Sequence, residues 1–425
     1  MKKNKVLSGV FLFLFIPVLC QAAVPQPKSE GKYFSGKGTR ASEGYESTAG
    51  MPVYDYGKGI QWGPVHFRPS LDYRFRWEDN VFLEESGEEK NDLINSIYGD
   101  LSAELPLGGG QHLVTAGGSF VREIFGSFDS QNHTNYMIHG GAKLNYVPFT
   151  LDFDDIYEQT ESRSNTEFTQ RVKRDENAFH SLLEVPFSQF FLENEITNFT
   201  SDYSLAANEV FSHNLFTVYQ RLGHDISPNT QVLAELTYIN IDYSHVGDRN
   251  GEGFQYTGGL RGNLSEFIAY QAWIGAQHRS YDSDVRPDFN NLVFRAALQY
   301  EPSSLSTWVL KWVRLPQEST YDDQSFYTHN QADLSWKRQI RDRVYWNTQG
   351  SIGYNEYSRI TVRAATSEAE TRRDWLWNAG TGLEYKMPND IVSLTLDYRY
   401  VNRESNMDGL DYEGNEVSVG AKALF

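Results

Sequence analysis

The last eleven residues of the sequence, 415–425, alternate strictly between apolar and polar side chains. One face of the predicted strand carries Val417, Val419, Ala421, Ala423 and Phe425. The opposite face carries Glu416, Ser418, Gly420 and Lys422. A strand with one apolar face and one polar face is typical of a membrane β-barrel, in which the apolar face contacts lipid and the polar face lines the lumen. Every strand of such a barrel must pair on both sides, which strongly restricts the fold.

The same period of two recurs along most of the chain. Near the first predicted strand, an apolar face of Leu71, Tyr73, Phe75 and Trp77 alternates with Asp72, Arg74, Arg76 and Glu78. Equivalent apolar faces are predicted at 136–146, 254–264, 292–300, 375–385 and 392–400. Aromatic residues stand at both ends of several of these faces, with small or aliphatic residues between them. This distribution is typical of the two aromatic girdles of a membrane barrel, and a soluble β-sandwich has no reason to show it.

Short turns alternate with longer polar loops between the predicted strands. The turns are predicted at 106–110, 146–149, 186–189, 223–229, 265–267, 302–306, 341–343 and 387–390. Longer loops include 84–92, 162–174, 282–290, 316–324, 358–370 and 402–411. Short periplasmic turns and long extracellular loops are characteristic of outer-membrane barrels. We therefore predict an all-β fold, a transmembrane antiparallel β-barrel of about 18 strands of roughly 10 to 14 residues.

Composition supports a barrel over a helical membrane protein. The chain contains 26 Tyr, 26 Phe and 9 Trp, which makes it 14% aromatic, yet its mean hydropathy is −0.54. A bundle of membrane helices cannot be this polar. A barrel can, because only every second strand residue faces lipid.

The N-terminus has the organisation of a secretory signal peptide. Lys2, Lys3 and Lys5 precede an apolar run, and we predict cleavage after Ala22 or Ala23. The predicted organisation is a signal peptide at 1–23, a flexible periplasmic arm at 24–63 and an outer-membrane barrel at 64–425. In an alternative, part of the arm enters the barrel as a plug.

Charge and cysteine content exclude several classes of function. Removing the signal peptide changes the formal net charge from −18 to −21, which disfavours nucleic acid as a partner. It also removes Cys20, the one cysteine, and with it any disulfide or thiolate site. No nucleophile elbow, zinc-binding His pair or phosphate-binding glycine loop is found, so we expect no enzyme, no cofactor and no metal site.

The polar strand faces supply the candidates for a path through the lumen. The predicted inward cations are Arg74, Arg76, Arg221, Arg261, Arg279, Arg295, Lys311 and Arg399. Acidic residues on the same kind of face include Asp72, Glu78, Glu193, Glu195 and Glu235. In one interpretation these charges pair across neighbouring strands and rigidify the wall. In the other, guanidinium and amide groups contact a sugar or an anion in a hydrated channel.

The first predicted hairpin resembles a known family. The residues Trp77-Glu78-Asp79-Asn80-Val81-Phe82, an acidic loop to Asp92, and then Leu101-Ser102-Ala103-Glu104-Leu105 are similar to the opening of the β-barrel porin type 2 family. This family overlaps with outer-membrane proteins of exopolysaccharide biosynthesis clusters. The resemblance implies a barrel over residues 64–425 and a role in polysaccharide export. The C-terminal face of Val419, Ala421, Ala423 and Phe425 also resembles the signature bound by the bacterial barrel-assembly machinery.

These observations lead to three hypotheses. The first is a porin-like conduit for an exported exopolysaccharide or a related carbohydrate, in the outer membrane of a Gram-negative bacterium. The second is a general diffusion porin for small solutes. The third is a structural, adhesin or lipid-modifying barrel with no open pore. The expected partners are outer-membrane lipid, the assembly machinery, a carbohydrate or small solute in the lumen, and periplasmic export proteins.

Overall fold

The computed structural model describes residues 59–425, apart from 164–166, 285, 322–323, 363–368 and 389. The predicted signal peptide and residues 24–58 of the predicted arm lie outside this described part. The strands are β1 (Ile60–Trp62), β2 (Val65–Glu78), β3 (Asp92–Leu107), β4 (His112–Phe125), β5 (His133–Asn145), β6 (Thr150–Ser162), β7 (Val172–Phe187), β8 (Phe190–Tyr203), β9 (His213–Ser227), β10 (Thr230–Tyr243), β11 (Gly251–Ser265), β12 (Ile268–Tyr281), β13 (Phe289–Ser303), β14 (Ser306–Glu318), β15 (Phe326–Arg341), β16 (Val344–Val362), β17 (Ala369–Lys386), β18 (Val392–Ser405) and β19 (Tyr412–Leu424). The short 3-10 helices are η1 (Gly108–Gly110), η2 (Asp129–Gln131), η3 (Glu209–Phe211) and η4 (Gly247–Arg249).

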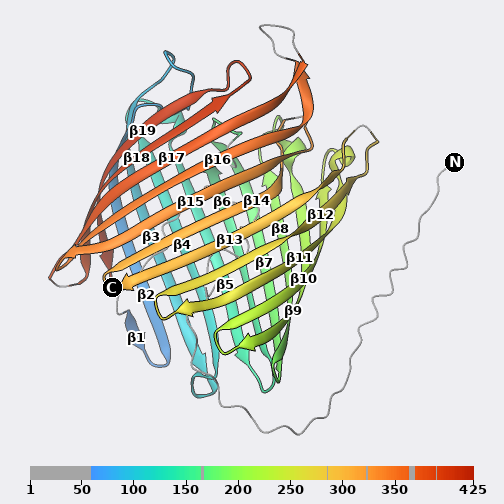
Figure 1. Cartoon of the computed structure of the whole chain (residues 1–425). Helices are drawn as coiled ribbons and strands as arrows, with labels where there is room; N and C mark the ends of the chain where they lie inside the picture. Colours follow the sequence, from blue (N-terminus) through green and yellow to red (C-terminus); the bar gives the residue numbers. More distant parts are fainter. Residues whose placement is uncertain (1–58, 164–166, 285, 322–323, 363–368, 389) are drawn as a thin grey trace. The chain divides into compact units, whose positions relative to one another are not determined.

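Strands β2 to β19 form a closed antiparallel barrel of 18 strands (Figure 1). Each strand pairs with the next in sequence, and β19 closes the ring by pairing with β2 from Glu416 opposite Glu78 to Leu424 opposite Ser70. The predicted fold class and strand count are confirmed. No helix among the described residues is long and apolar enough to span a membrane.

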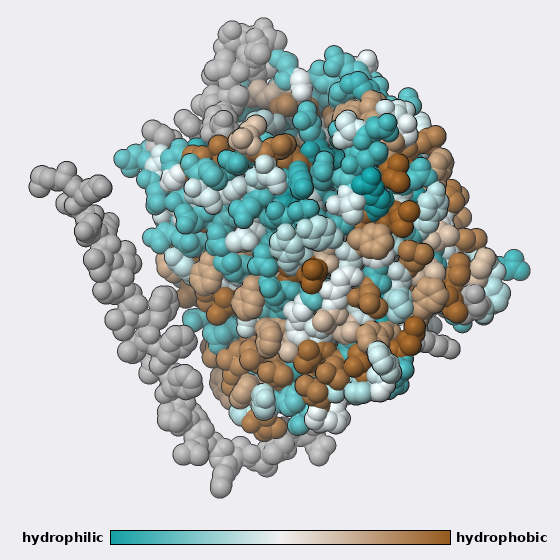
Figure 2. Space-filling model, turned by 180° about the vertical axis from the view of Figure 1, so that it is seen from behind, coloured by the Kyte–Doolittle hydropathy of each residue, from teal (hydrophilic) through white to brown (hydrophobic). Residues whose placement is uncertain are grey.

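Register and alternation assign every strand residue to one of two faces, since directly opposed residues share a face. On β2, Leu71, Tyr73, Phe75 and Trp77 point outward and are 39–49% exposed. Between them, Asp72 points inward and is 2% exposed. The barrel is therefore apolar outside and polar inside, as the alternation predicted. Figure 2 shows hydrophobic residues concentrated over the end with the short turns, and hydrophilic residues toward the loops.

Eight of the 18 barrel strands are longer than the predicted 10 to 14 residues, and β16 is the longest at 19 residues. The other ten span 13 or 14 residues, within the predicted length. The predicted turn at 223–229 begins too early, because β9 continues to Ser227. The predicted loops at 358–370 and 402–411 also begin within strands. Hairpins that extend beyond the lipid can be polar on both faces, so the apolar alternation ends before the backbone pairing does.

A short strand flanks the seam between the first and last barrel strands. Residues Ile60 to Trp62 of β1 pair with Phe67 to Val65 of β2, along the side of β2 on which β19 pairs further up. The backbone N–H of Gly59 donates to the carbonyl of Phe425 at 3.0 Å. Residues 60–62, within the predicted arm at 24–63, therefore form a strand.

Candidate functional site

The eight predicted cations all lie on the inner face of the barrel wall. On β9, Arg221 stands in register between Glu193 of β8 and Glu235 of β10. The others lie at Arg74 and Arg76 on β2, Arg261 on β11, Arg279 on β12, Arg295 on β13, Lys311 on β14 and Arg399 on β18. Alternation alone could place these residues on one face, but their partners depend on the pairing of the strands.

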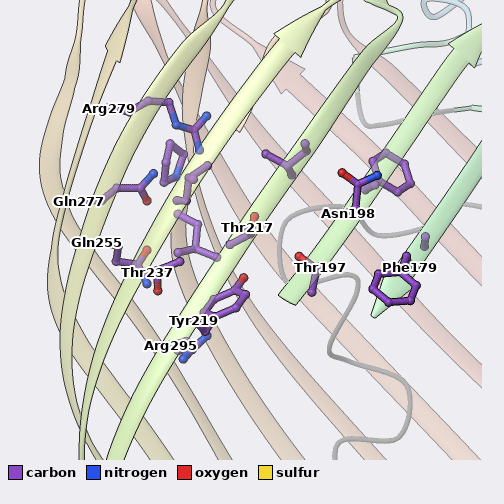
Figure 3. A pocket seen from close by; sticks show the side chains of 16 residues that line it. Phe179, Thr197, Asn198, Thr217, Tyr219, Thr237, Gln255, Gln277, Arg279 and Arg295 are labelled. Atoms are coloured by element: carbon purple, nitrogen blue, oxygen red, sulfur yellow. The ribbon is translucent and has the colours of Figure 1, made fainter. Parts of the chain in front are cut away.

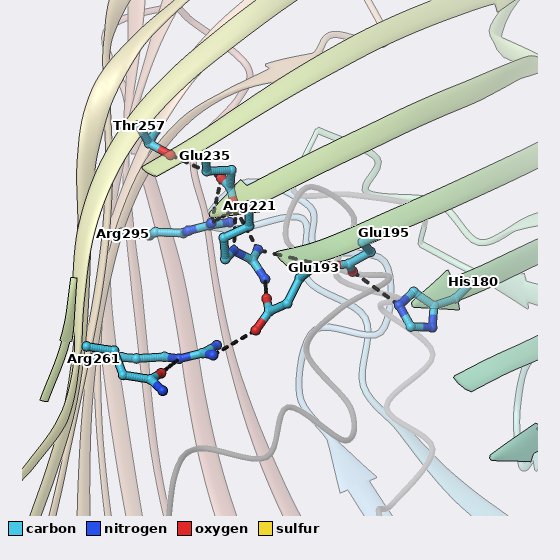
Figure 4. A network of polar contacts seen from close by, with 9 residues as sticks. His180, Glu193, Glu195, Arg221, Glu235, Thr257, Arg261 and Arg295 are labelled. Carbon is cyan, nitrogen blue, oxygen red and sulfur yellow. Dashed lines mark hydrogen bonds and ion pairs between the residues drawn. The ribbon is translucent and has the colours of Figure 1, made fainter. Parts of the chain in front are cut away.

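Three of the cations meet in one group, which we name the central charge cluster: Arg221, Arg261, Arg295, Glu193 and Glu235 (Figure 4). Arg221 donates to both carboxylates, reaching Glu235 at 2.5 Å. Arg295 donates to Glu235 at 2.8 Å, and Arg261 donates to Glu193 at 2.7 Å. The side chains of Glu193 and Glu235 are 4% and 0% exposed. Carboxylates this deeply buried need charged partners, which these guanidinium groups supply.

The central charge cluster continues along the wall. Glu195 lies 3.9 Å from Arg221 and 3.2 Å from His180 (Figure 4). The other ring nitrogen of His180 lies 3.1 Å from Asp154. The guanidinium groups of Arg221 and Arg295 both lie over the ring of Trp273, at 5.0 and 4.8 Å. Charge and stacking together fix these side chains in place.

A second group of charges lies on β2 and its neighbours. Arg76 contacts Glu78 at 2.8 Å and Glu123 at 2.9 Å, and Arg74 contacts Asp72 at 3.0 Å. Arg279, on the other side of the ring, forms an ion pair with Glu318. Six of the eight predicted cations are thus paired with carboxylates, some across neighbouring strands and Arg74 with Asp72 of its own strand.

Lys311 and Arg399 differ from the other six cations. Both are exposed, and neither forms an ion pair with another described residue. Their register neighbours include Asp333 for Lys311 and Glu416 for Arg399.

A loop bridges the end of the barrel at which the long loops lie. The hairpins β6–β7 and β14–β15 face each other across the ring, with six strands, β8 to β13, between them on one side. Glu167 of the first loop accepts hydrogen bonds from the hydroxyl of Ser319 at 2.8 Å and from the N–H and hydroxyl of Thr320 at 2.5 and 2.8 Å. We name this contact the cross-mouth latch: Glu167, Ser319 and Thr320.

The same loop is also held at its two ends. Arg163 and Arg171 donate to the carbonyl of Val81 in the β2–β3 loop, at 2.6 and 3.3 Å. Phe168 packs on Tyr203 and Phe211, with ring centroids 6.1 and 5.8 Å apart. The loop therefore contacts three other loop regions around the mouth.

The β14–β15 loop receives a further set of contacts. Arg249 of η4 donates to the carbonyls of Ser319, Tyr321 and Gln324 at 2.7, 2.9 and 2.8 Å. Arg286 of the β12–β13 loop donates to the same Gln324 carbonyl at 3.2 Å. These contacts hold the β14–β15 loop in place, and this loop carries Ser319 and Thr320 of the cross-mouth latch.

Burial shifts the pKa of two residues of the loop between β6 and β7, Glu167 and Arg163. Burial raises the pKa of Glu167 above that of an ordinary carboxyl, although the Thr320 hydrogen bonds and the charge of Arg372 act in the opposite direction. Burial, with the nearby charge of Arg171, lowers the pKa of Arg163 to about 10.

The latch, Arg249 and His180 were not predicted from the sequence. Glu167 and Thr320 are separated by 153 residues and lie in irregular loops, where no periodic pattern indicates which residues meet. In the described part of the chain, no group of His, Cys, Asp and Glu side chains could hold a metal ion.

A closed ring, an apolar exterior and a charged interior define a β-barrel of the outer membrane. The family model described as Putative beta-barrel porin 2 matches residues 51–425, and the chain belongs to this family. The family resemblance predicted from the first hairpin is therefore confirmed. The protein is a porin-like outer-membrane channel, with lipid around it and small solutes in its lumen. The short turns lie on the periplasmic side and the long loops outside the cell.

Solved structures with a similar fold include proteins of Acinetobacter baumannii and Pseudomonas aeruginosa. OccAB3 of Acinetobacter baumannii is 11% identical, with a TM-score of 0.47 over 85% of this chain and 99% of that one. OpdO of Pseudomonas aeruginosa is 12% identical, with a TM-score of 0.48 over 85% of this chain and 97% of that one. OpdK of the same organism is 8% identical, with a TM-score of 0.48 over 84% and 99%. A search of curated proteins gave no match.

Proposed function

We propose that the barrel is a conduit for an exported exopolysaccharide or a related carbohydrate. The observation that supports this most is the neutralisation of the inner wall. The central charge cluster sets three guanidinium groups against the carboxylates of Glu193 and Glu235, with Glu195 beside them. A wall with its charges already paired holds anions weakly, but it still presents many hydrogen-bonding groups to a hydroxyl-rich solute.

A general diffusion porin for small solutes is the second candidate. Lys311 and Arg399 are exposed on the inner face, so they favour passage of small anions by long-range attraction. The third candidate, a barrel without an open pore, draws support from the cross-mouth latch, which connects opposite sides of the mouth.

Planar-bilayer conductance of the purified protein separates the three candidates. A steady conductance that neutral or acidic oligosaccharides block is expected for the carbohydrate conduit. A conductance indifferent to sugar would favour the general porin. Absence of conductance, both in the full chain and after removal of the cross-mouth latch, would favour the closed barrel.

The remaining parts of the chain have proposed roles in export and assembly. Residues 1–23 direct secretion and are cleaved after Ala22 or Ala23, and the arm at 24–63 lies in the periplasm, where export partners would contact it. The apolar C-terminal face of Val419, Ala421, Ala423 and Phe425 binds the barrel-assembly machinery. Mass spectrometry of the mature N-terminus tests the cleavage site.

A further inference from the structure

A pocket lies on the inner wall of the barrel, above the central charge cluster, between β7 and β14. Figure 3 shows Thr237, Gln255 and Gln277 on adjacent strands of this wall, with Arg279 and Arg295 at its two ends. The pocket belongs to the barrel wall and is separate from the loops of the cross-mouth latch.

One side of the pocket is a row of neutral polar side chains, Tyr219, Thr237, Gln255 and Gln277, which we name the polar row. Each member stands directly opposite the next across four strands, β9 to β12. Because their register is continuous, the hydroxyl and amide groups form one line across the wall. Such a line presents both donors and acceptors.

Two members of the polar row have polar atoms without a protein partner. The hydroxyl of Thr237 and the amide nitrogen of Gln277 form no hydrogen bond with any described residue, although each side chain is only 1% exposed. Buried polar groups in folded proteins are almost always hydrogen-bonded. Both residues line the pocket, so a molecule held there could complete their hydrogen bonds.

Another part of the lining is apolar. Phe199, Leu215, Ile239 and Leu315 line the pocket beside the polar row. A sugar ring has the matching asymmetry, with C–H groups on its faces and hydroxyl groups around its edge. Pockets that combine an apolar surface with a few placed polar groups are typical of sites for small ligands.

The charges near the pocket argue for a neutral ligand. Arg279 is engaged by Glu318, and Arg295 is engaged by Glu235. Both guanidinium groups already have a carboxylate partner, so they add little attraction for an acidic sugar. We propose that this pocket binds a neutral hexopyranose unit of a glycan, with Thr237 and Gln277 hydrogen-bonding its hydroxyl groups. The proposal rests on the carbohydrate conduit proposed above and assigns it a binding subsite.

Equilibrium binding to the full-length protein in detergent tests the subsite directly. The probes are a neutral maltodextrin and an oligogalacturonate of matched length, measured by titration calorimetry. The variants Thr237→Val and Gln277→Leu keep the side-chain size and remove the hydrogen-bonding atoms. Each should weaken maltodextrin binding roughly three- to tenfold, as expected for the loss of one hydrogen bond. The control is Thr115→Val, which removes an inward hydroxyl on β4, outside the pocket.

The outcomes separate the subsite from the conduit. Equal binding by the wild type and both variants would overturn the subsite, as would tighter binding of the acidic probe or no maltodextrin binding. Heat-modifiable electrophoretic mobility confirms that each variant is folded. Uptake of the same maltodextrin into proteoliposomes tests the conduit separately. Binding without uptake would reject the conduit and leave the subsite. Uptake that is equal in the wild type and both variants, with no measurable binding, would reject the subsite alone.

Discussion

Glu167 accepts hydrogen bonds from both the backbone N–H and the hydroxyl of Thr320, at 2.5 and 2.8 Å, across the extracellular mouth of the barrel. The two residues belong to hairpins on opposite sides of the ring, so this contact spans the mouth. Replacing Glu167 with Ala removes all the hydrogen bonds of the latch. We expect mean single-channel conductance, or the fraction of time spent open, to rise several-fold. Glu209→Ala, in the neighbouring β8–β9 loop, is the control, and an unchanged conductance in Glu167→Ala would show that the latch does not limit the mouth.

The latch should also respond to pH. Burial raises the pKa of Glu167 in the latched loop, so the latch is most stable below the pKa of an ordinary exposed carboxyl. Its stability falls as pH rises through the raised value, because the buried carboxyl must then ionise. Conductance should therefore increase as pH rises above the range in which an ordinary exposed carboxyl ionises. Glu167→Gln, which stays neutral, should lose most of this dependence, and an identical pH profile in this variant would assign the effect to another group.

The central charge cluster makes a strong prediction about stability. Replacing Arg221 with Met removes one guanidinium partner from each of the buried carboxylates of Glu193 and Glu235. Breaking a buried ion pair in this way typically costs about 3–5 kcal/mol. Urea unfolding of protein reconstituted in lipid vesicles measures this cost. Lys311→Met, on the same inner wall but exposed, should cost less than about 0.5 kcal/mol, and equal losses in the two variants would contradict the structural role.

Lys311 and Arg399 should govern ion selectivity rather than stability. Both are exposed and lack an ion-pair partner among the described residues. The double variant Lys311→Glu/Arg399→Glu should move the reversal potential in a salt gradient toward cation preference, because fixed lumen charge sets the local ion concentration. The control is Lys173→Glu, which changes an exposed residue on the outer face of β7. A reversal potential that shifts equally in the control would exclude a specific lumen effect.

Removal of Phe425 should impair assembly of the barrel. Its backbone N–H donates to the carbonyl of Pro69 at 3.1 Å, so the last residue also helps to close the ring. We expect a large fall in the amount of heat-modifiable protein in the outer-membrane fraction. Lys422→Ala, at an inward position of β19, should assemble normally. Normal assembly without Phe425 would remove the proposed role of the C-terminal face.

Much of the fold could be predicted because a membrane barrel repeats one pattern in every strand. The outward row of Leu71, Tyr73, Phe75 and Trp77 follows from alternation alone, and alternation also places Arg221 and Arg295 on the inner face. The strand ends were less predictable, as β9 shows by continuing to Ser227. Beyond the lipid, the environment no longer requires one apolar face.

The contacts of the site could not be predicted in the same way. The pair of Arg261 and Glu193 links residues 68 positions apart on β11 and β8, and depends on how three hairpins are staggered. The Glu167–Thr320 contact depends on the paths of two irregular loops. Among the pocket residues, the inward face of Gln255 and Gln277 follows from alternation. The partnerless atoms of Thr237 and Gln277 become visible only when the packing of the wall is known.

Strand β1 has a consequence for the solubility of assembly intermediates. β19 pairs with β2 only from Ser70 upward, which would leave residues 65–67 of β2 with unpaired backbone groups on that side. Ile60 to Trp62 occupy this stretch. Unpaired strand edges recruit strands from other chains and start aggregation. The three residues of β1 fold back onto the first barrel strand, so the stretch of β2 that β19 does not reach is no longer a free edge for neighbouring copies.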